Sequence, residues 1–271
     1  MPLPFAAVAF DMDGTFLRDD KSFDRPRFAR ILEALLAQGC HVIVASGDPA
    51  QFLLPHFGDQ CEALTVIAEN GAQVIDQGHE LMTTTLERTL AAQVVAFLHD
   101  ELQIEPTLAG VKQGYFPPHP SAALLAHMTR YYPQHTILDQ LLPLPDDDFF
   151  QLSFLVADQD VANVKAQLDA RFTGQLTVTP SGNGSMDLTI PGINKGWALS
   201  KVLAQWQLSG DDLIAFGDGG NDESMLKLAR YSYAMPNGRP EIKRLARFSV
   251  PVDNNHDGVL VVLDQYLQEH Q

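Results

Sequence analysis

The chain has 271 residues and a formal net charge of −16, with 45% hydrophobic and 19% charged residues. This length allows one large domain or two smaller ones, and the composition predicts a folded protein rather than a disordered one. The acidic balance argues against a nucleic-acid partner, because phosphate backbones are bound mainly by clustered Lys and Arg.

Cys40 and Cys61 are too few for a disulfide scaffold and favour a reducing compartment. Residues 1–10 lack the basic segment of a signal peptide, and no apolar run in the sequence is long enough to span a bilayer. The sequence therefore predicts a cytoplasmic protein that does not associate with membranes. We expect a monomer or a weak homodimer.

The first elements form a strand, a helix and a second strand. Residues 6–10 and 41–45 are short apolar runs that end in polar loops, which is typical of parallel strands buried on both faces. Between them, residues 25–38 carry apolar side chains at helical spacing, and Gly39 supplies a stop. This order predicts a βαβ unit.

A stretch of different character follows, at residues 82–186. It mixes helical periodicity with strand-like runs and is interrupted by prolines. The helical patterns lie at 86–99, 122–131 and 161–172, and the strand-like runs lie at 151–156 and 175–179. We expect an α+β domain here, inserted between the two halves of a core formed by 1–81 and 187–271.

The C-terminal part returns to the first pattern, with a helix at 195–205, an apolar strand at 213–216 and a helix at 223–229. The fold class is therefore α/β, with a doubly wound, Rossmann-like parallel sheet as its core. Ligands of such sheets bind beyond the carboxyl ends of the strands. The polar loops after residues 10, 45 and 216 would share that edge.

Asp11 and Asp13 follow the first strand directly, in the sequence Asp-Met-Asp-Gly-Thr. Two neighbouring carboxylates are costly unless a cation or a proton relieves them, so the pair favours a site for a hard metal ion. Gly14 permits a tight turn behind them. The alternative is a capped turn in which the carboxylates accept nearby backbone N–H groups.

A second acidic cluster, Gly-Asp-Gly-Gly-Asn-Asp at 217–222, follows the strand at 213–216. Its glycines allow a ligand to approach the backbone, and Asp218 offers an oxygen ligand of the kind that magnesium prefers. The alternative is a glycine-rich turn in which Asn221 or Asp222 caps the following helix.

Ser46 and Gly47 end the strand at 41–45, where a hydroxyl and a backbone N–H could hold phosphate oxygens. A Ser-Gly pair is also a common turn. Lys195 opens a helix, at the end where the helix dipole disfavours a cation, so it calls for an anionic partner. The alternative is a solvated surface lysine.

The order of these motifs strongly resembles the haloacid dehalogenase superfamily, in its phosphatase branch with a large cap between the second and third motifs. The resemblance covers essentially the whole chain. The motifs at 68–72 (Ala-Glu-Asn-Gly-Ala) and 254–258 (Asn-Asn-His-Asp-Gly) look like the Cof-type subfamily, particularly its bacterial sugar phosphatases. The resemblance implies that residues 82–186 form a cap that determines substrate specificity.

The resemblance also implies roles for individual residues. Asp11 would be the nucleophile and a ligand of Mg²⁺, and Asp13 would be the general acid and base, with its carbonyl on the metal. Asp218 would be a further metal ligand. The phosphate would contact the Met12 backbone N–H, Ser46, Gly47, Lys195 and Asn221.

Asp48 departs from the family pattern, which often has Arg after the Ser-Gly or Thr-Gly pair. An acidic residue there would repel an anion, so we exclude Asp48 from the phosphate site and leave open a contact with a sugar hydroxyl. In the predicted cap, Lys112 and Tyr115 could meet a sugar phosphate. A hairpin with Tyr115 packed inside is the alternative.

The expected activity is Mg²⁺-dependent hydrolysis of a small phosphorylated metabolite, with a sugar phosphate as the leading substrate, through an aspartyl-phosphate intermediate. A phosphatase acting on pyridoxal phosphate or flavin mononucleotide is an alternative. A phosphomutase and a non-catalytic regulatory protein on the same fold also remain. The intact set of Asp11, Asp13, Lys195 and Asp218 argues against the regulatory protein.

Overall fold

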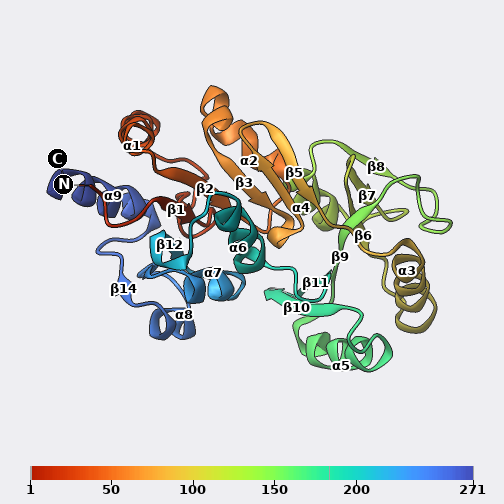
Figure 1. Ribbon diagram of the computed structural model, residues 1–271. Coiled ribbons are helices and arrows are strands. Elements are labelled where there is room, and N and C mark those ends of the chain that lie inside the picture. The colour runs from red at the N-terminus through yellow and green to blue at the C-terminus, as the bar shows by residue number, and fades with distance from the viewer. Residues whose placement is uncertain (1, 183, 271) are drawn as a thin grey trace. The chain divides into compact units, whose positions relative to one another are not determined.

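A computed structural model describes residues 2–182 and 184–270. Backbone contacts divide the chain into two compact units. Unit 1 comprises the chain up to Met82 and from Asn194 onward, and unit 2 is Thr83–Ile193. The polypeptide therefore leaves unit 1 once, builds unit 2, and returns (Figure 1).

Unit 1 is built on an eight-stranded sheet in the order β14-β13-β12-β1-β2-β3-β4-β5. The strands from β14 to β3 are parallel, and β4 turns back antiparallel to β3. Their bounds are β1 Ala7–Phe10, β2 His41–Ala45, β3 Thr65–Ala68, β4 Gln73–Asp76, β5 His79–Thr83, β12 Leu213–Gly217, β13 Tyr231–Ala234 and β14 Phe248–Ser249. The chain order reverses direction at β1, as in a doubly wound sheet.

Helices cover both faces of this sheet. The longer ones are α1 Arg25–Ala37, α6 Lys195–Gln205 and α9 Gly258–Glu269, and the shorter ones are α2 Ala50–Leu53, α7 Glu223–Leu228 and α8 Pro240–Leu245. Among the described residues, no helix combines the length and the apolar character that crossing a membrane would require.

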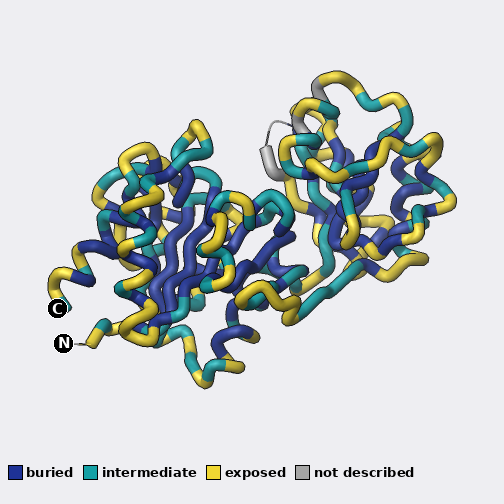
Figure 2. The backbone as a smooth tube through the Cα atoms, turned by 90° about the horizontal axis from the view of Figure 1, so that it is seen from above, coloured by how far each residue is buried: buried dark blue, intermediate teal, exposed yellow. Residues whose placement is uncertain are grey.

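The strand side chains alternate between two apolar cores. In β1, Val8 and Phe10 pack with α1 and α9, whereas Ala7 and Ala9 pack with α6 and α7. Strands buried on both faces cannot show polar alternation, which explains the continuous apolar runs in the sequence. Figure 2 shows these central strands buried along their length.

Unit 2 is an α+β module with a six-stranded sheet in the order β10-β11-β9-β6-β7-β8. Its strands are β6 Thr107–Gly110, β7 Gly114–Phe116, β8 His135–Ile137, β9 Phe149–Leu155, β10 Thr177–Gly182 and β11 Ser185–Thr189, and its helices are α3 Arg88–Leu102, α4 Ala122–Tyr131 and α5 Val161–Arg171. Helices α3 and α5 bury Val94, Leu98 and Leu168 against Leu108 and Leu152 of the sheet.

The fold class is the one the sequence predicts. The boundary at 186 falls inside β11, which pairs with both β9 and β10, and unit 2 continues to Ile193. Residues 110–116 form the hairpin with Tyr115 packed inside, which was the alternative to a substrate-binding loop. Tyr115 is only 5% exposed and donates its hydroxyl to Asp147 at 3.1 Å, while the Lys112 ammonium donates to the Asp146 carbonyl at 2.6 Å.

Aromatic packing beneath the β1 loop gives a stability prediction. The Phe28 ring lies between 5.2 and 6.3 Å from the rings of Phe10, Phe16, Phe23 and Phe57. Because truncation leaves a cavity at the centre of this cluster, we expect Phe28→Ala to lower the free energy of unfolding by about 3–5 kcal/mol.

Chemical denaturation followed by near-ultraviolet circular dichroism measures this change. The control is Phe248→Ala, because Phe248 is 44% exposed and its loss should cost at most about 1 kcal/mol. Equal losses in the two variants would contradict the prediction.

Candidate active site

The predicted motifs meet at one edge of the unit 1 sheet. Phe10 is in register with Phe216 of β12 and with Val44 of β2, and all three strands are parallel. Asp11, the loop from residue 218 and Ser46 therefore leave the sheet at the same edge. This is the edge at which doubly wound sheets bind ligands.

An ammonium group lies at the centre of this cluster. Lys195 is 0% exposed, and its Nζ donates to Asp11 Oδ1 at 2.6 Å and to Asp222 Oδ1 at 2.7 Å. Asp11 is 6% exposed and Asp222 is 0% exposed. A buried cation is tolerated only with such partners, so the interpretation of Lys195 as a solvated surface residue does not hold.

Lys195 is the first residue of α6, and the start of this helix positions it. Asn194 caps the helix by accepting the Trp197 backbone N–H at 2.9 Å. Gly71 packs against this start so closely that a Cβ there would lie 2.5 Å from the Asn194 carbonyl oxygen, and its φ is +103°. Glycine is therefore required in the motif at 68–72, because a side chain would push the loop away from Lys195.

The loop after β12 is organised by Asp222. Its Oδ2 accepts the backbone N–H groups of Asp218 and Gly219, each at 2.9 Å. Asp218 in turn accepts the Thr15 hydroxyl at 2.9 Å. Gly14 has a φ of +76°, and a Cβ there would lie 2.7 Å from Asp218 Oδ2. The two acidic motifs thus interlock directly.

Asp11, Asp218 and Asp222 form a cluster whose ligand atoms all lie within 4.8 Å of one another. Burial and the neighbouring Asp222 raise the pKa of Asp11 well above its ordinary value, although Lys195 acts in the opposite direction. Burial and Asp222 likewise raise the pKa of Asp218.

Burial alone would lower the pKa of Lys195, but Asp11 and Asp222 outweigh it and raise that pKa. Three carboxylates therefore face one ammonium, and their mutual repulsion is what a divalent cation would relieve. An oxygen-only donor set of this kind fits a hard ion such as Mg²⁺.

Asp13 lies beside this cluster, and one of its carboxylate oxygens forms an ion pair with Lys21. Lys21 Nζ donates to Asp13 Oδ2 at 2.6 Å, and the two side chains are about one-third exposed, at 32% and 37% respectively. Asp13 Oδ1 is buried and has no hydrogen-bond partner among the described residues. One carboxylate oxygen is thus held and the other is left for a further partner.

In the Ser46-Gly47 turn, the serine side chain accepts a hydrogen bond from the backbone that follows it. The Ser46 hydroxyl accepts the Asp48 N–H at 3.1 Å, which leaves the hydroxyl proton available for donation. Gly47 lies against Asn70, whose amide oxygen accepts from Asn221 at 3.2 Å. The Met12 side chain is buried in the core, so only its backbone faces the site.

Sequence reasoning missed two residues of this site. Its sequence context makes Asp222 a candidate helix cap, yet its carboxylate accepts from Lys195 and from the loop N–H groups rather than from the first turn of α7. Lys21 was not singled out at all. The second aspartate of the 217–222 motif was a usable signal, whereas a lysine in a polar turn carries none.

The sequence matches the family described as haloacid dehalogenase-like hydrolase over residues 8–263. The chain belongs to this family of hydrolases, and the resemblance drawn from its motifs is confirmed. It is 31% identical over 261 residues to the 5-amino-6-(5-phospho-D-ribitylamino)uracil phosphatase YbjI of Escherichia coli, covering 96% of each chain.

It is also 31% identical over 251 residues to an HMP-PP phosphatase of Yersinia pseudotuberculosis, covering 89% of this chain and 87% of that one. Among solved structures, a protein of Streptococcus mutans shares 38% identity at a TM-score of 0.91, over 97% of this chain and 99% of that one. A haloacid dehalogenase-like hydrolase of Bacillus subtilis shares the fold at a TM-score of 0.83 and 21% identity, over 96% of this chain and 99% of that one.

Asp48 gives a prediction about pH. Burial, and then the charge of Asp13, raise the pKa of Asp48 from 3.8 to about 6. The folded state therefore disfavours the charged carboxylate, so the contribution of Asp48 to stability falls as the pH rises from 3.8 through 6. In metal-free protein, we expect Asp48→Asn to be more stable than wild type by about 1–3 kcal/mol near neutral pH.

The gain should shrink steadily below the raised pKa, because the wild-type carboxyl is then protonated in the folded state. Thermal unfolding in chelator across acidic to neutral pH measures it, and Asp59→Asn, at an exposed carboxylate, is the control. A difference independent of pH would refute the assignment.

Proposed function

We propose that the chain is a Mg²⁺-dependent phosphatase that hydrolyses a small phosphate monoester through a phosphorylated Asp11. The observation that carries the proposal is the buried Lys195 ammonium held between Asp11 and Asp222, with Asp218 beside them. A carboxylate placed next to a fixed cation, in an oxygen-rich cluster, is suited to attack an anionic ester. The phosphatases among the relatives support the same activity.

The residues that would hold Mg²⁺ are Asp11, Asp218 and Asp222, and the Asp13 carbonyl is the further ligand implied by the family. When bound, the ion would offset the negative charge of the ester and of the carboxylates. Burial and then the charge of Asp222 raise the pKa values of Asp11 and Asp218, and a bound cation would offset both effects by stabilising the charged carboxylates.

In the proposed first step, Oδ2 of Asp11 attacks phosphorus and forms a P–O bond while the ester P–O bond breaks. Lys195 holds the other oxygen, Oδ1, so the carboxylate cannot rotate away. Asp13 gives a proton to the leaving alkoxide. In the second step Asp13 removes a proton from water, which attacks phosphorus and releases Asp11 and inorganic phosphate.

The phosphate would be held by groups on four loops of unit 1. The Ser46 hydroxyl has a proton to donate, and the exposed Asn221 side chain donates to Asn70, which lies against Gly47. The backbone N–H groups of Met12 and Gly47 and the ammonium of Lys195 complete the proposed set. Unit 2 is proposed as the cap that selects the leaving group, since these groups recognise only phosphate.

The proposed substrate class is the phosphorylated sugar or sugar alcohol. The relative from Escherichia coli, by its name, acts on a phosphorylated ribityl group, which supports this class over an aromatic ester. Phosphate release over a panel tests it, with hexose and pentose phosphates, 5-amino-6-(5-phospho-D-ribitylamino)uracil, HMP-PP, pyridoxal phosphate and flavin mononucleotide. Release from one substrate without a bisphosphate activator would exclude a phosphomutase.

Replacing the nucleophile should separate activity from folding. We expect Asp11→Asn to lower kcat by at least about 1,000-fold, because the amide cannot form the phosphorylated intermediate. Its melting temperature should not fall, since Lys195 keeps Asp222 and one of three repelling carboxylates is gone. Steady-state phosphate release in a variant shown by mass spectrometry to be free of deamidation would rule out Asp11 as the nucleophile.

Metal removal should silence the enzyme reversibly. We expect chelation to abolish phosphate release and Mg²⁺ to restore it, and Mg²⁺ to raise the melting temperature of the chelated protein, because a ligand of the folded state stabilises it. The stabilisation should disappear in Asp218→Asn, which loses a proposed ligand. Undiminished turnover in the chelated protein would contradict the metal requirement.

A further inference from the structure

The loop between β1 and α1 contains a tight turn at residues 18–22. The Arg18 carbonyl accepts the Lys21 N–H and the Arg18 N–H donates to the Ser22 carbonyl, both at 2.9 Å. Lys21 closes the turn with a φ of +65°, in the left-handed region. Glycine fills such a position without steric cost, whereas a lysine there is strained. Stability alone therefore gives no reason for a lysine.

The Lys21 side chain contacts the proposed acid and base. Its ammonium bonds Asp13 Oδ2, and the pair is about one-third exposed, where an ion pair contributes little to folding. What the contact does is fix the direction of the Asp13 carboxylate, whose Oδ1 stays buried without a partner among the residues described. Strain accepted at a group that orients a reactive carboxylate is typical of functional sites.

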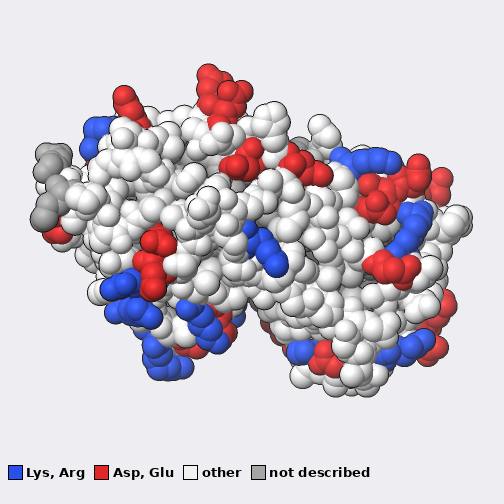
Figure 3. Space-filling view, in the orientation of Figure 1, with Lys and Arg blue, Asp and Glu red and all other residues white. Residues whose placement is uncertain are grey.

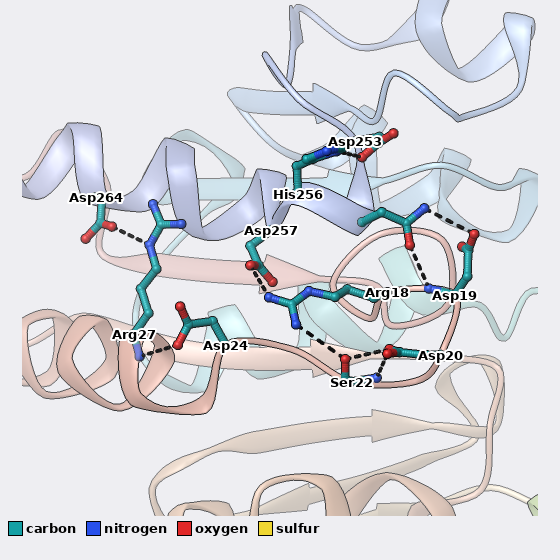
Figure 4. A network of polar contacts seen from close by, with 11 residues as sticks. Arg18, Asp19, Asp20, Ser22, Asp24, Arg27, Asp253, His256, Asp257 and Asp264 are labelled. Atoms are coloured by element: carbon teal, nitrogen blue, oxygen red, sulfur yellow. Dashed lines mark hydrogen bonds and ion pairs between the residues drawn. The ribbon is translucent and has the colours of Figure 1, made fainter.

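The turn itself is anchored to the segment before α9, in the network shown in Figure 4. Asn255 bonds Asp19 twice, accepting its N–H at 3.0 Å and donating to its carboxylate at 3.1 Å. Asn254, which is buried, donates to the Leu17 carbonyl at 2.9 Å and to Asp19 at 3.1 Å. Arg18 pairs with Asp257.

The anchoring segment has little freedom of its own. His256 bonds Asp253 at 2.6 Å, and Asp257 is held at a φ of +53°. A Cβ on Gly258 would lie 2.2 Å from the Val252 carbonyl oxygen, so the backbone must pass there without a side chain. Residues 253–258, called the template below, thus form a rigid segment that fixes the position of the turn through these contacts.

We propose that Lys21 is a positioning residue for Asp13, and that the template at 253–258 acts on the reaction through it. The inference rests on the proposed function, because it assigns Asp13 the proton transfers. It explains why a motif far from the reacting atoms in sequence, Asn-Asn-His-Asp-Gly, contacts the loop that carries the catalytic aspartates.

The test is Lys21→Gly, assayed with the phosphate ester of the panel that the wild type hydrolyses fastest. Because glycine relieves the φ strain, we expect the melting temperature to stay level or rise, while kcat falls about 10- to 100-fold. KM should change by less than about twofold, since phosphate binding is untouched. Lys21→Arg, which keeps a cation in reach of Asp13, should recover part of kcat.

A double-mutant cycle tests the template. Asn255→Ala alone should lower kcat, but Lys21→Gly/Asn255→Ala should be no slower than Lys21→Gly, because both act through one contact. The control is Asp264→Asn, which breaks the ion pairs from Arg27 and Arg30 that join α1 to α9. It should lower the melting temperature and leave kcat unchanged.

The outcomes separate the two proposals. Full kcat in Lys21→Gly with an active wild type would overturn this inference and leave the proposed function standing. If the fall in kcat of the double variant equals the product of the falls in the two single variants, the role of the template is overturned. A wild type that hydrolyses none of the phosphate esters in the panel would overturn the proposed function, and this inference with it.

Discussion

The rest of the site depends on one buried ammonium group. Lys195 has no solvent contact, and its ion-pair partners among the described residues are Asp11 and Asp222, at 2.6 and 2.7 Å. Loss of both carboxylates would leave an unpaired buried charge, which typically costs several kcal/mol. Because Lys195 and Asp11 are 184 positions apart in the sequence, this one ion fixes the start of α6 against the end of β1. The Asp11 carboxylate, which is the proposed nucleophile, is therefore oriented by folding itself.

This constraint also explains where the chain cannot carry side chains. A Cβ on Gly196 would lie 2.5 Å from the Ser224 carbonyl oxygen, and one on Gly217 would lie 2.6 Å from the Asp222 Cβ. Helices α6 and α7 and the end of β12 must approach this closely for Lys195 to reach Asp222. The glycines next to the acidic motifs thus serve approach of backbone to backbone, in addition to any approach of a ligand.

Much of the fold and part of the site could be predicted from local patterns. Short apolar runs that end at Asp11, Ser46 and Asp218 indicate buried parallel strands and the sheet edge. Burial on both faces and polar loops can be recognised from consecutive residues. Which residues pair over long distances cannot be recognised in this way. The boundary at 186 missed that β11 pairs with β9, and Asp222 was not recognised because its partner, Lys195, lies 27 positions away. The sequence gives no signal for Lys21, since its proposed role depends on a contact with Asp13 that the fold of the turn creates.

The acidity of the chain sets the last constraint on the site. The net charge is −16, and on the face drawn in Figure 3 the basic side chains do not merge into one surface that would attract anions. A phosphate ester must therefore be held by local charge. The chain's own cations at the site are Lys195, already shared by two carboxylates, and Lys21, which is engaged by Asp13. Both ammonium groups already offset carboxylate charge. In the proposed phosphatase, a divalent cation at the cluster of Asp11, Asp218 and Asp222 would add positive charge for the phosphate that Lys195 also contacts.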